Sequence, residues 1–110
     1  MPDPPMSTEA VDPSKVLREG QELFFAEPPN HRGAAELFEQ VVALSPTWAE
    51  GHQWLGSAYE ALGDEDRAAR AWQTARKLDR NDSRCLISLG VLRTRQRRFK
   101  EAIQLLKQGI

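Results

Sequence analysis

The chain has 110 residues, enough for one folded unit with a small hydrophobic core. Apolar residues make up 40% of it and charged residues 28%, and the net charge of −1 gives no overall field that would attract nucleic acid or an anionic membrane. The single cysteine, Cys85, excludes an internal disulfide and a cysteine-built metal site. No apolar run approaches the roughly 20 residues of a membrane helix, and the N-terminus does not resemble a signal peptide, so we expect a cytoplasmic protein.

The N-terminal residues 1–13 contain four prolines and few apolar side chains. Such a segment buries too little apolar surface to offset the entropy lost on ordering, so we expect a disordered tail. We assign residues 14–110 to one helical domain. The first part of this domain contains two sets of helix breakers, Pro28-Pro29-Asn30 and Ser45-Pro46-Thr47, which indicate two helices.

The helical pattern is clearest in residues 49–82. An apolar stripe spaced by four, three, four and three residues predicts a first helix, formed by Trp48, His52, Leu55, Tyr59 and Leu62. Gly63 ends this helix, and Asp64-Glu65-Asp66 place negative charge at the start of the next. The second helix carries its own apolar face, made of Ala68, Trp72, Ala75 and Leu78.

The last part of the chain is also expected to form two helices. A polar turn, Asp79-Arg80-Asn81-Asp82, offers capping residues for a helix that starts at Ser83. We expect a turn at Gln96-Arg97-Arg98 and a second helix from Phe99.

The same residue types recur along the chain in one register. Leu55-Gly56 recurs as Leu89-Gly90, Ala68 corresponds to Ala34 and Ala102, and Trp72 corresponds to the large apolar residues Phe38 and Leu106. All of these pairs share one fixed period, and a period of roughly 34 residues is the signature of a helix–turn–helix repeat protein. The repeats lie near residues 15–48, 49–82 and 83–110, without insertions between them, and the last is incomplete.

Small residues recur inside helices, where glycine costs about 1 kcal/mol against alanine. Gly56 and Gly90 stand where the first helix of a pair would cross the second, so the absence of a side chain permits close approach. Ala68 and Ala102 are the small residues expected opposite them, and Trp72 fills the space beyond.

These residues resemble the tetratricopeptide repeat family. The second repeat carries the family's pattern almost completely, in Leu55-Gly56, Tyr59, Gly63, Ala68, Trp72 and Ala75. The third fits at Leu89-Gly90, Phe99 and Ala102, with Arg93 in place of an aromatic residue. The first departs from it in its opening helix, where Gln21-Glu22 replaces Leu-Gly. The resemblance implies an all-α helix–turn–helix solenoid, wound as a right-handed superhelix, whose groove is lined by the first helix of each pair.

That groove commonly holds a peptide or a partner's helix in the family. Carried onto this sequence, its lining is Glu19, Leu23, Gln53, Trp54, Ser57, Arg84, Ser88, Val91 and Arg95. Trp54 lies off the apolar stripe of its own helix, so we predict that it anchors a bound partner. The alternative is that Trp54 packs between neighbouring repeats.

We find no pattern that indicates catalysis. His31 and His52 fall on different elements, with no serine or cysteine arranged as a nucleophile beside them. Asp64-Glu65-Asp66 could be taken for a metal site, but their place at a helix start favours charge–dipole stabilisation. We therefore predict a protein that is not an enzyme and that has no metal and no cofactor.

Charge is distributed unevenly along the chain. Residues 1–48 carry a net charge of −5, residues 49–82 of −2 and residues 83–110 of +6. The basic end is either a solvated face or the binding site of an acidic partner. It lacks the interleaved aromatic residues of single-strand nucleic-acid binders. Leu106 and Ile110 lie near an end that no following helix covers, so we also expect weak self-association.

These patterns together predict a protein–protein interaction module that acts as a scaffold or adaptor. The alternatives are a regulatory or substrate-recruiting domain of a larger enzyme, and a self-assembling adaptor.

Overall fold

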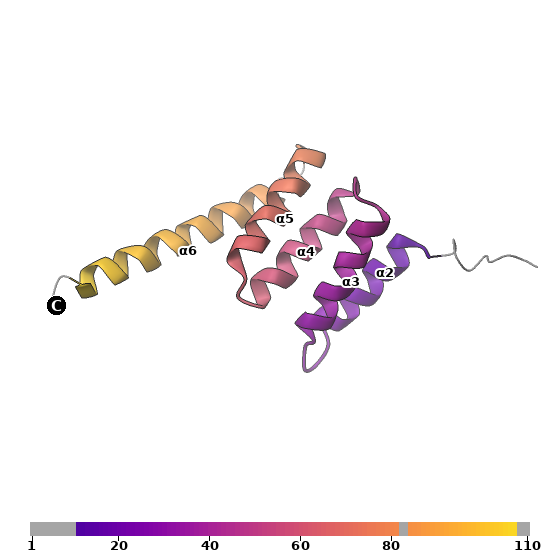
Figure 1. Ribbon diagram of the computed structural model, residues 1–110, viewed down its shortest axis with the longest axis horizontal. Coiled ribbons are helices and arrows are strands. Elements are labelled where there is room, and N and C mark those ends of the chain that lie inside the picture. The colour runs from indigo at the N-terminus through magenta and orange to yellow at the C-terminus, as the bar shows by residue number, and fades with distance from the viewer. Residues whose placement is uncertain (1–10, 82–83, 108–110) are drawn as a thin grey trace, which may run out of the picture.

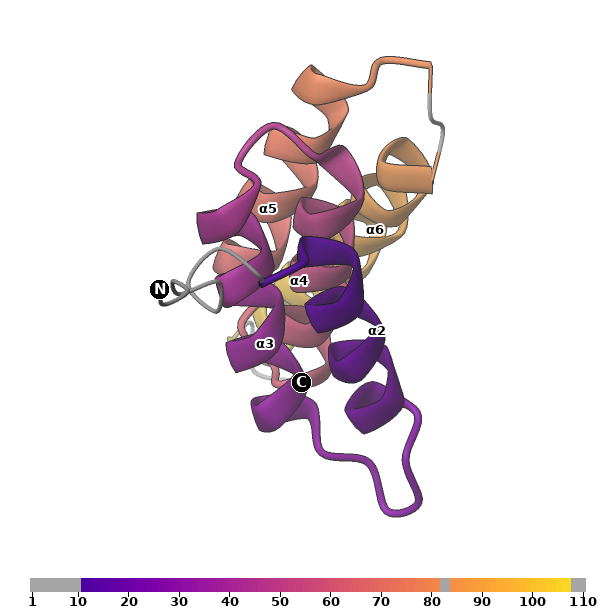
Figure 2. The ribbon, with the colours of Figure 1, turned by 90° about the vertical axis from the view of Figure 1, so that its right-hand side faces the viewer.

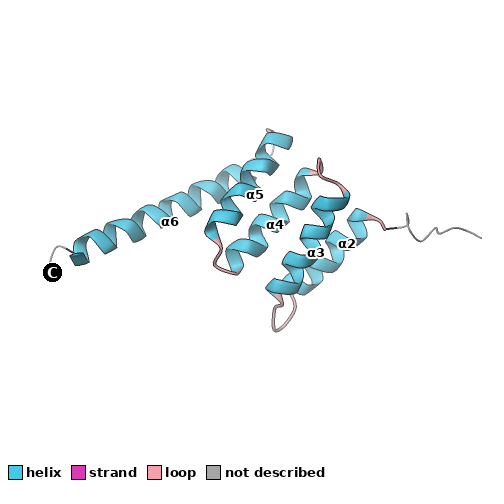
Figure 3. Ribbon diagram, in the orientation of Figure 1, coloured by secondary structure: helices cyan, strands magenta, loops and turns pink. Residues whose placement is uncertain are grey.

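The structure, a computed structural model, describes residues 11–81 and 84–107, and every regular element in these ranges is an α-helix (Figure 3). In chain order the helices are α2 (Pro13–Phe24), α3 (His31–Leu44), α4 (Ala49–Ala61), α5 (Glu65–Leu78) and α6 (Arg84–Lys107). The predicted all-α helical repeat architecture is confirmed.

Each helix packs mainly against its neighbours in the sequence. Contacts join α2 to α3, α3 to α4, α4 to α5 and α5 to α6 (Figure 1). Figure 2 shows α3 and α5 on one side of the stack and α2 and α6 on the other. The helices therefore form a linear array in which contacts between distant repeats are few, as expected of a solenoid.

The second helix of each of the first two repeats starts at a side-chain cap. Asn30 accepts a hydrogen bond from the backbone N–H of Gly33 at 2.9 Å, and Asp64 accepts one from that of Arg67 at 3.1 Å. Asn30 and Asp64 occupy the same position in successive repeats, so the cap belongs to the repeat. Each such cap stabilises its helix by about 1 kcal/mol.

The first repeat is longer at its inner turn than the fixed period indicates. The second helices, α3 and α5, start one period apart at His31 and Glu65, but α4 starts two residues later than one period after α2. The two extra residues lie in the loop 25–30, whereas the turn between α4 and α5 spans only residues 62–64. The prediction of repeats without insertions is therefore wrong for the opening helix.

This shift identifies Gly20, not Glu22, as the counterpart of Gly56. A Cβ atom added to Gly20 would collide with the ring of Phe38, and one added to Gly56 would collide with the indole of Trp72. Both hairpins therefore use the same device, a glycine beneath a large aromatic ring. Glycine is kept there because any side chain would push the two helices apart.

The tail boundary also moves. The Asp12 side chain accepts a hydrogen bond from the backbone N–H of Ser14 at 3.0 Å, and Pro13 occupies the first turn of α2. Proline suits this position because it has no N–H to leave unpaired. Asp12 and Pro13, which we assigned to the tail, therefore belong to the start of the helix, while residues 1–10 of the predicted tail lie outside the described residues.

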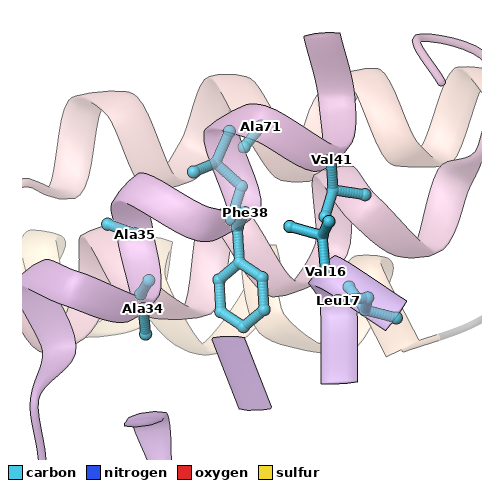
Figure 4. Close-up of a cluster of buried hydrophobic side chains, with 9 residues drawn as sticks. Val16, Leu17, Ala34, Ala35, Phe38, Val41 and Ala71 are labelled. Atoms are coloured by element: carbon cyan, nitrogen blue, oxygen red, sulfur yellow. The ribbon is translucent and has the colours of Figure 1, made fainter. Parts of the chain in front are cut away.

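Two buried clusters form the core. The first joins α2, α3 and α4 around Phe38, as Figure 4 shows, with a further contribution from Ala71 of α5. The second joins α5 and α6 and consists of Ala68, Trp72, Ala75, Cys85, Leu89 and Leu92. Phe38 is fully buried and Trp72 is 3% exposed, so each aromatic ring is the centre of one layer.

The same contact between neighbouring repeats pairs side chains of different sizes in the two layers. A Cβ added to Gly51 of α4 would lie 2.9 Å from Cγ1 of Val41, so glycine here makes room for valine. The equivalent positions in the next repeat hold Cys85 and Ala75, both buried in the second cluster. In the first layer the larger side chain of this pair is Val41 on α3, and in the second layer it is Cys85 on α6. The buried thiol of Cys85 therefore serves to fill space in the core.

The predicted turn at Gln96-Arg97-Arg98 is wrong, because α6 runs as one helix from Arg84 to Lys107. Arg97 and Arg98 take the positions of Gly63 and Asp64 in the preceding repeat. Gly63 adopts a φ of +85°, which costs other residues about 1–2 kcal/mol, and Asp64 provides the helix cap. Since arginine supplies neither feature and is a good helix former, the helix continues.

The continuous helix changes the part played by Gly90. Among the described residues no neighbouring atom lies within 4 Å of a Cβ added to Gly90, so no described helix crosses close above this glycine. The expected role of Gly90 in a close helix crossing is therefore wrong for this structure. The side chains of Phe99 and Ala102, on which the third hairpin was also predicted, lie outside the described residues.

Candidate partner-binding groove

A cavity of about 190 Å³ opens between α4 and the start of α6. Its lining consists of Gln53, Trp54, Ser57, Trp72, Arg84, Cys85 and Ser88. Five of the nine predicted groove residues are brought together here, because the first helices of consecutive repeats lie side by side along the stack.

The floor of the cavity consists of core residues. Trp72 and Cys85 are 3% and 2% exposed, and both belong to the second core cluster. The indole N–H of Trp72 donates a hydrogen bond to the backbone carbonyl of Gln53 at 3.2 Å. The hydroxyl of Ser57 donates to the same carbonyl at 3.3 Å. The floor is therefore held by core packing and by hydrogen bonds that no ligand is needed to form.

The rim of the cavity is polar. Arg84 is exposed, while Ser57 and Ser88 are half-buried on facing helices. A guanidinium group and hydroxyls are donors that suit carboxylate and carbonyl oxygens of a peptide. The cavity thus combines an apolar base with hydrogen-bond donors at its mouth.

Trp54 has a packing role, which was the alternative to a role in binding. Its ring centroid lies 5.8 Å from that of Phe24, 5.7 Å from that of Phe25 and 5.9 Å from that of Phe38. These rings come from α2, its following loop and α3, so Trp54 packs between the first and second repeats. One side of its half-buried side chain also lines the cavity, so its role as an anchor for a partner stays a prediction.

Glu19 and Leu23 do not line this cavity. In the register set by the longer first loop they correspond to Leu55 and Tyr59 rather than to Gln53 and Ser57. Glu19 is exposed, and Leu23 packs against the first core cluster. The residues that take the positions of Trp54 and Ser57 on α2 are Arg18 and Gln21. Sequence reasoning missed them because it assumed one spacing for all helices.

Val91 and Arg95 lie further along α6, outside the cavity. Val91 is 55% exposed and lines an open depression on α6. Arg95 forms ion pairs with Glu60 at 2.9 Å and with Glu65 at 3.4 Å. The hydrogen bond from Arg95 to Glu60 raises the pKa of Arg95 above its usual value, so the guanidinium stays charged. Arg95 therefore ties α6 to the turn between α4 and α5.

The residues that could suggest chemistry have structural partners. The ring of His31 packs at a tilt of 58° against that of Phe24, with ring centroids 4.9 Å apart, and His52 Nε2 lies 2.8 Å from the carbonyl oxygen of Pro46. Asp64 caps α5 and pairs with Arg67 at 3.4 Å. Within residues 11–81 and 84–107, no three His, Cys, Asp or Glu side chains are grouped as metal ligands would be. None of the helices in the same ranges is both long and apolar enough to cross a membrane.

Comparison with known proteins gives three findings. Family models described as tetratricopeptide repeat match residues 49–82 and 85–110. Over its 110 residues the chain is 28% identical to the aspartyl/asparaginyl beta-hydroxylase of Mus musculus, but it spans only 14% of that protein. Its fold is similar to the crystal structure of MamA, with a TM-score of 0.71 and 20% identity, over 87% of this chain and 55% of that one.

Proposed function

Because the chain belongs to the tetratricopeptide repeat family, whose repeats mediate protein interactions, we propose that it binds a peptide or a partner's helix in the groove between α4 and α6. The observation that carries this proposal is the cavity with a buried, largely apolar floor and a rim of hydrogen-bond donors. Such a site is already formed without a ligand, so binding requires little ordering of the protein.

The size of the cavity favours a side chain as its occupant. Small-molecule sites are typically about 300–1,000 Å³, whereas this cavity measures about 190 Å³. One side chain of an extended or helical segment fits such a volume, with the rest of the segment lying along the open face of α4 and α6. We therefore expect recognition of a segment, with one residue inserted.

Charge favours an acidic segment. Arg84 lies at the mouth of the cavity, and residues 83–110 carry a net charge of +6. A carboxylate inserted beside Arg84 would gain a charge-assisted hydrogen bond, and the hydroxyls of Ser57 and Ser88 would supply further donors. The partner that we propose is a protein segment with an acidic residue at its anchor position.

The test uses peptides selected on the chain from a displayed random library. We expect the selected peptides to be enriched in Asp and Glu, and Arg84→Glu to weaken their binding by about tenfold to a hundredfold, since a hydrogen bond to a charged group contributes about 1.5–3 kcal/mol. Arg93→Glu is the matched control, because Arg93 is an exposed arginine of α6 that does not line the cavity. Equal loss in both variants would show a general charge effect and would count against the groove.

The relationship to an enzyme supports a second candidate function. The whole chain aligns with one part of the aspartyl/asparaginyl beta-hydroxylase, so the groove could serve to recruit substrates for a catalytic domain elsewhere in a longer protein. Sequencing the complete open reading frame tests this idea. A catalytic domain in the same reading frame would support substrate recruitment, and its absence would leave the interaction module alone.

A further inference from the structure

An exposed apolar stripe runs along the first half of α6. Ile87 and Val91 are 62% and 55% exposed, and together with Gly90 and Thr94 they line an open depression of about 620 Å³. These four residues are spaced by three, one and three positions, so they share one face of the helix. The opposite face of α6 belongs to the second core cluster. The stripe therefore faces away from the rest of the array.

The first two repeats show what covers this face in a complete hairpin. Gly90 corresponds to Gly56 of α4, which lies beneath the indole of Trp72. Gly20 of α2 lies beneath the ring of Phe38 in the same way. In both hairpins a second helix thus places a large apolar side chain over a glycine. Among the described residues, no neighbouring atom lies within 4 Å of a Cβ added to Gly90. The stripe therefore has the shape that receives a helix, and no described helix lies on it.

The second half of α6 does not supply that helix. The turn between α4 and α5 uses Gly63 in the left-handed region and Asp64 as a cap, whereas α6 has arginines at both positions and continues straight. Leu106, which takes the position of Trp72, lies 16 residues beyond Gly90. Over this length a straight helix turns through about 160° beyond its last full turn, so Leu106 points to nearly the opposite side from the stripe.

A second copy of the same stripe fits poorly because of charge. Two such stripes packed antiparallel about Gly90 and Val91 would bring Arg98 of each copy to the N-terminal end of the other α6, near residue 83. The N-terminus of a helix carries a partial positive charge, so an arginine is unfavourable there. The described residues that line the depression also include no carboxylate to offset this charge. The occupant that suits the stripe is therefore a different segment.

The charge at one end of the depression indicates what that segment carries. Arg95 and Arg98 both line this end. Arg95 is already paired with Glu60 and Glu65, whereas Arg98 has no ion pair with any side chain that the structure describes. An acidic side chain that contacted Arg98 would gain a charge-assisted hydrogen bond. The stripe therefore favours a helix that carries an acidic residue as well as a large apolar one.

The hairpin of α4 and α5 indicates how far apart these two residues lie. Helices joined by so short a turn run antiparallel, so the residue opposite Arg98 comes before the one that covers Gly90. Gly90 and Arg98 are eight residues apart, which is about 12 Å along the helix axis. In the covering helix this distance corresponds to an acidic residue about seven positions before the apolar one, a spacing that places both on one face. Helix α5 has this pattern in Glu65 and Trp72.

We propose that the stripe of α6 binds an amphipathic helix of a partner protein, oriented antiparallel to α6. A large apolar side chain of that helix lies over Gly90, between Ile87 and Val91, and an acidic side chain about seven positions earlier pairs with Arg98. This surface goes beyond the groove between α4 and α6, with which it shares no lining residue. Either surface can therefore be tested without the other.

A peptide with the sequence of residues 64–78 is the probe, because it contains this pattern and forms the covering helix of the second hairpin. A side-chain crosslink between positions 70 and 74, on the face opposite Trp72, keeps the peptide helical. Fluorescence anisotropy measures its binding to the 110-residue chain, and we expect a dissociation constant below about 1 mM. Trp72→Ala in the peptide should weaken binding about tenfold or more, and Glu65→Gln about twofold to fivefold.

Gly90→Leu is the decisive variant of the chain. Leucine is a better helix former than glycine, and its Cβ meets no neighbouring described atom, so the fold should persist while the side chain fills the space over the helix. We expect the affinity for the probe to fall about tenfold or more. Arg98→Gln should lower it about twofold to fivefold. Arg93→Gln is the matched control, because Arg93 is an exposed arginine of α6 outside the depression. Circular dichroism checks that each variant remains helical.

The outcomes that contradict the proposal are distinct from those that contradict the groove. No binding of the crosslinked probe up to about 1 mM, or binding that survives Gly90→Leu, would overturn it. Binding that is lost in Arg84→Glu but kept in Gly90→Leu would assign the probe to the groove instead. A wild-type dimer in sedimentation velocity that dissociates in Gly90→Leu would show that a second copy occupies the stripe, which would also overturn the proposal.

Discussion

At the scale of single residues, the two tryptophans near the cavity differ in what they contact. Trp72 is 3% exposed, covers Gly56 and donates its indole N–H to a carbonyl. Trp54 is half-buried and touches three other aromatic rings from the neighbouring repeat. Both therefore contribute to stability and both line the cavity, Trp72 at its buried floor and Trp54 with part of a half-buried side chain. Trp54 thus packs against the core and also lines the groove, a combination that the apolar stripe of its helix does not predict.

We predict that Trp54→Ala and Trp72→Ala both destabilise the chain, by different amounts. Trp72→Ala should cost about 3–5 kcal/mol, as expected for a buried aromatic residue. Trp54→Ala loses three aromatic contacts of about 0.5–1.5 kcal/mol each, so a cost of about 1.5–4.5 kcal/mol is expected. Urea unfolding measures both changes. A wild-type midpoint for Trp54→Ala would show that its ring contacts do not stabilise the fold and would restore the view of Trp54 as a binding residue alone.

At the scale of elements, each hairpin depends on a glycine that lets its two helices approach. The rule holds for the α2–α3 and α4–α5 pairs, and the depth of approach is set by the ring of Phe38 or Trp72. It does not hold for α6, where the second helix of the pair is replaced by a straight continuation. The same residue type at equivalent positions thus has opposite consequences in different repeats.

We predict that Gly20→Ala and Gly90→Ala have opposite effects on the stability of the single chain. Alanine at position 20 would collide with Phe38, so the free energy of unfolding should fall by about 1–3 kcal/mol. Alanine at position 90 meets no neighbouring atom of the described part of the chain and improves helix propensity, so it should add about 0.5–1 kcal/mol.

Thermal melting at low concentration measures both values, because single chains dominate there. Destabilisation by Gly90→Ala in the dilute chain would indicate that the stripe is covered within one molecule.

At the scale of the whole molecule, stability comes from contacts between neighbouring helices. Helices α3, α4 and α5 each pack on a helix at either side, whereas α6 packs only on α5 among the helix pairs with extensive contacts in the described parts of the chain. Figure 1 shows the second half of α6 extending away from the other helices. In a linear array, a segment with one neighbour or none opens most easily.

We predict a gradient of amide hydrogen exchange along the chain. In dilute solution the amides of residues 99–107 should exchange fastest among the described helices, and those of α3 and α4 slowest. Protection of residues 99–107 as strong as that of α4 at dilution would contradict both the gradient and the open form of α6.

Much of this architecture follows from the sequence. The regular recurrence of Ala34, Ala68 and Ala102, with Phe38 and Trp72 one helical turn after the first two, predicted a helical repeat protein correctly. These features are local, because helix periodicity, caps and breakers act within a few residues of the chain. Five of the predicted groove residues also meet at one cavity, since they lie on the first helices of the second and third repeats, α4 and α6, where the fixed period of the repeat holds.

Only the tertiary structure decided which residues oppose one another. Two extra residues in the first loop moved Gly20 beneath Phe38 and took Glu19 and Leu23 out of the groove. The contacts of Trp54 depend on rings brought from another repeat, and the continuity of α6 depends on the balance between a turn and a straight helix. Periodicity along one helix cannot determine these outcomes, because they depend on the space between helices and on what fills it.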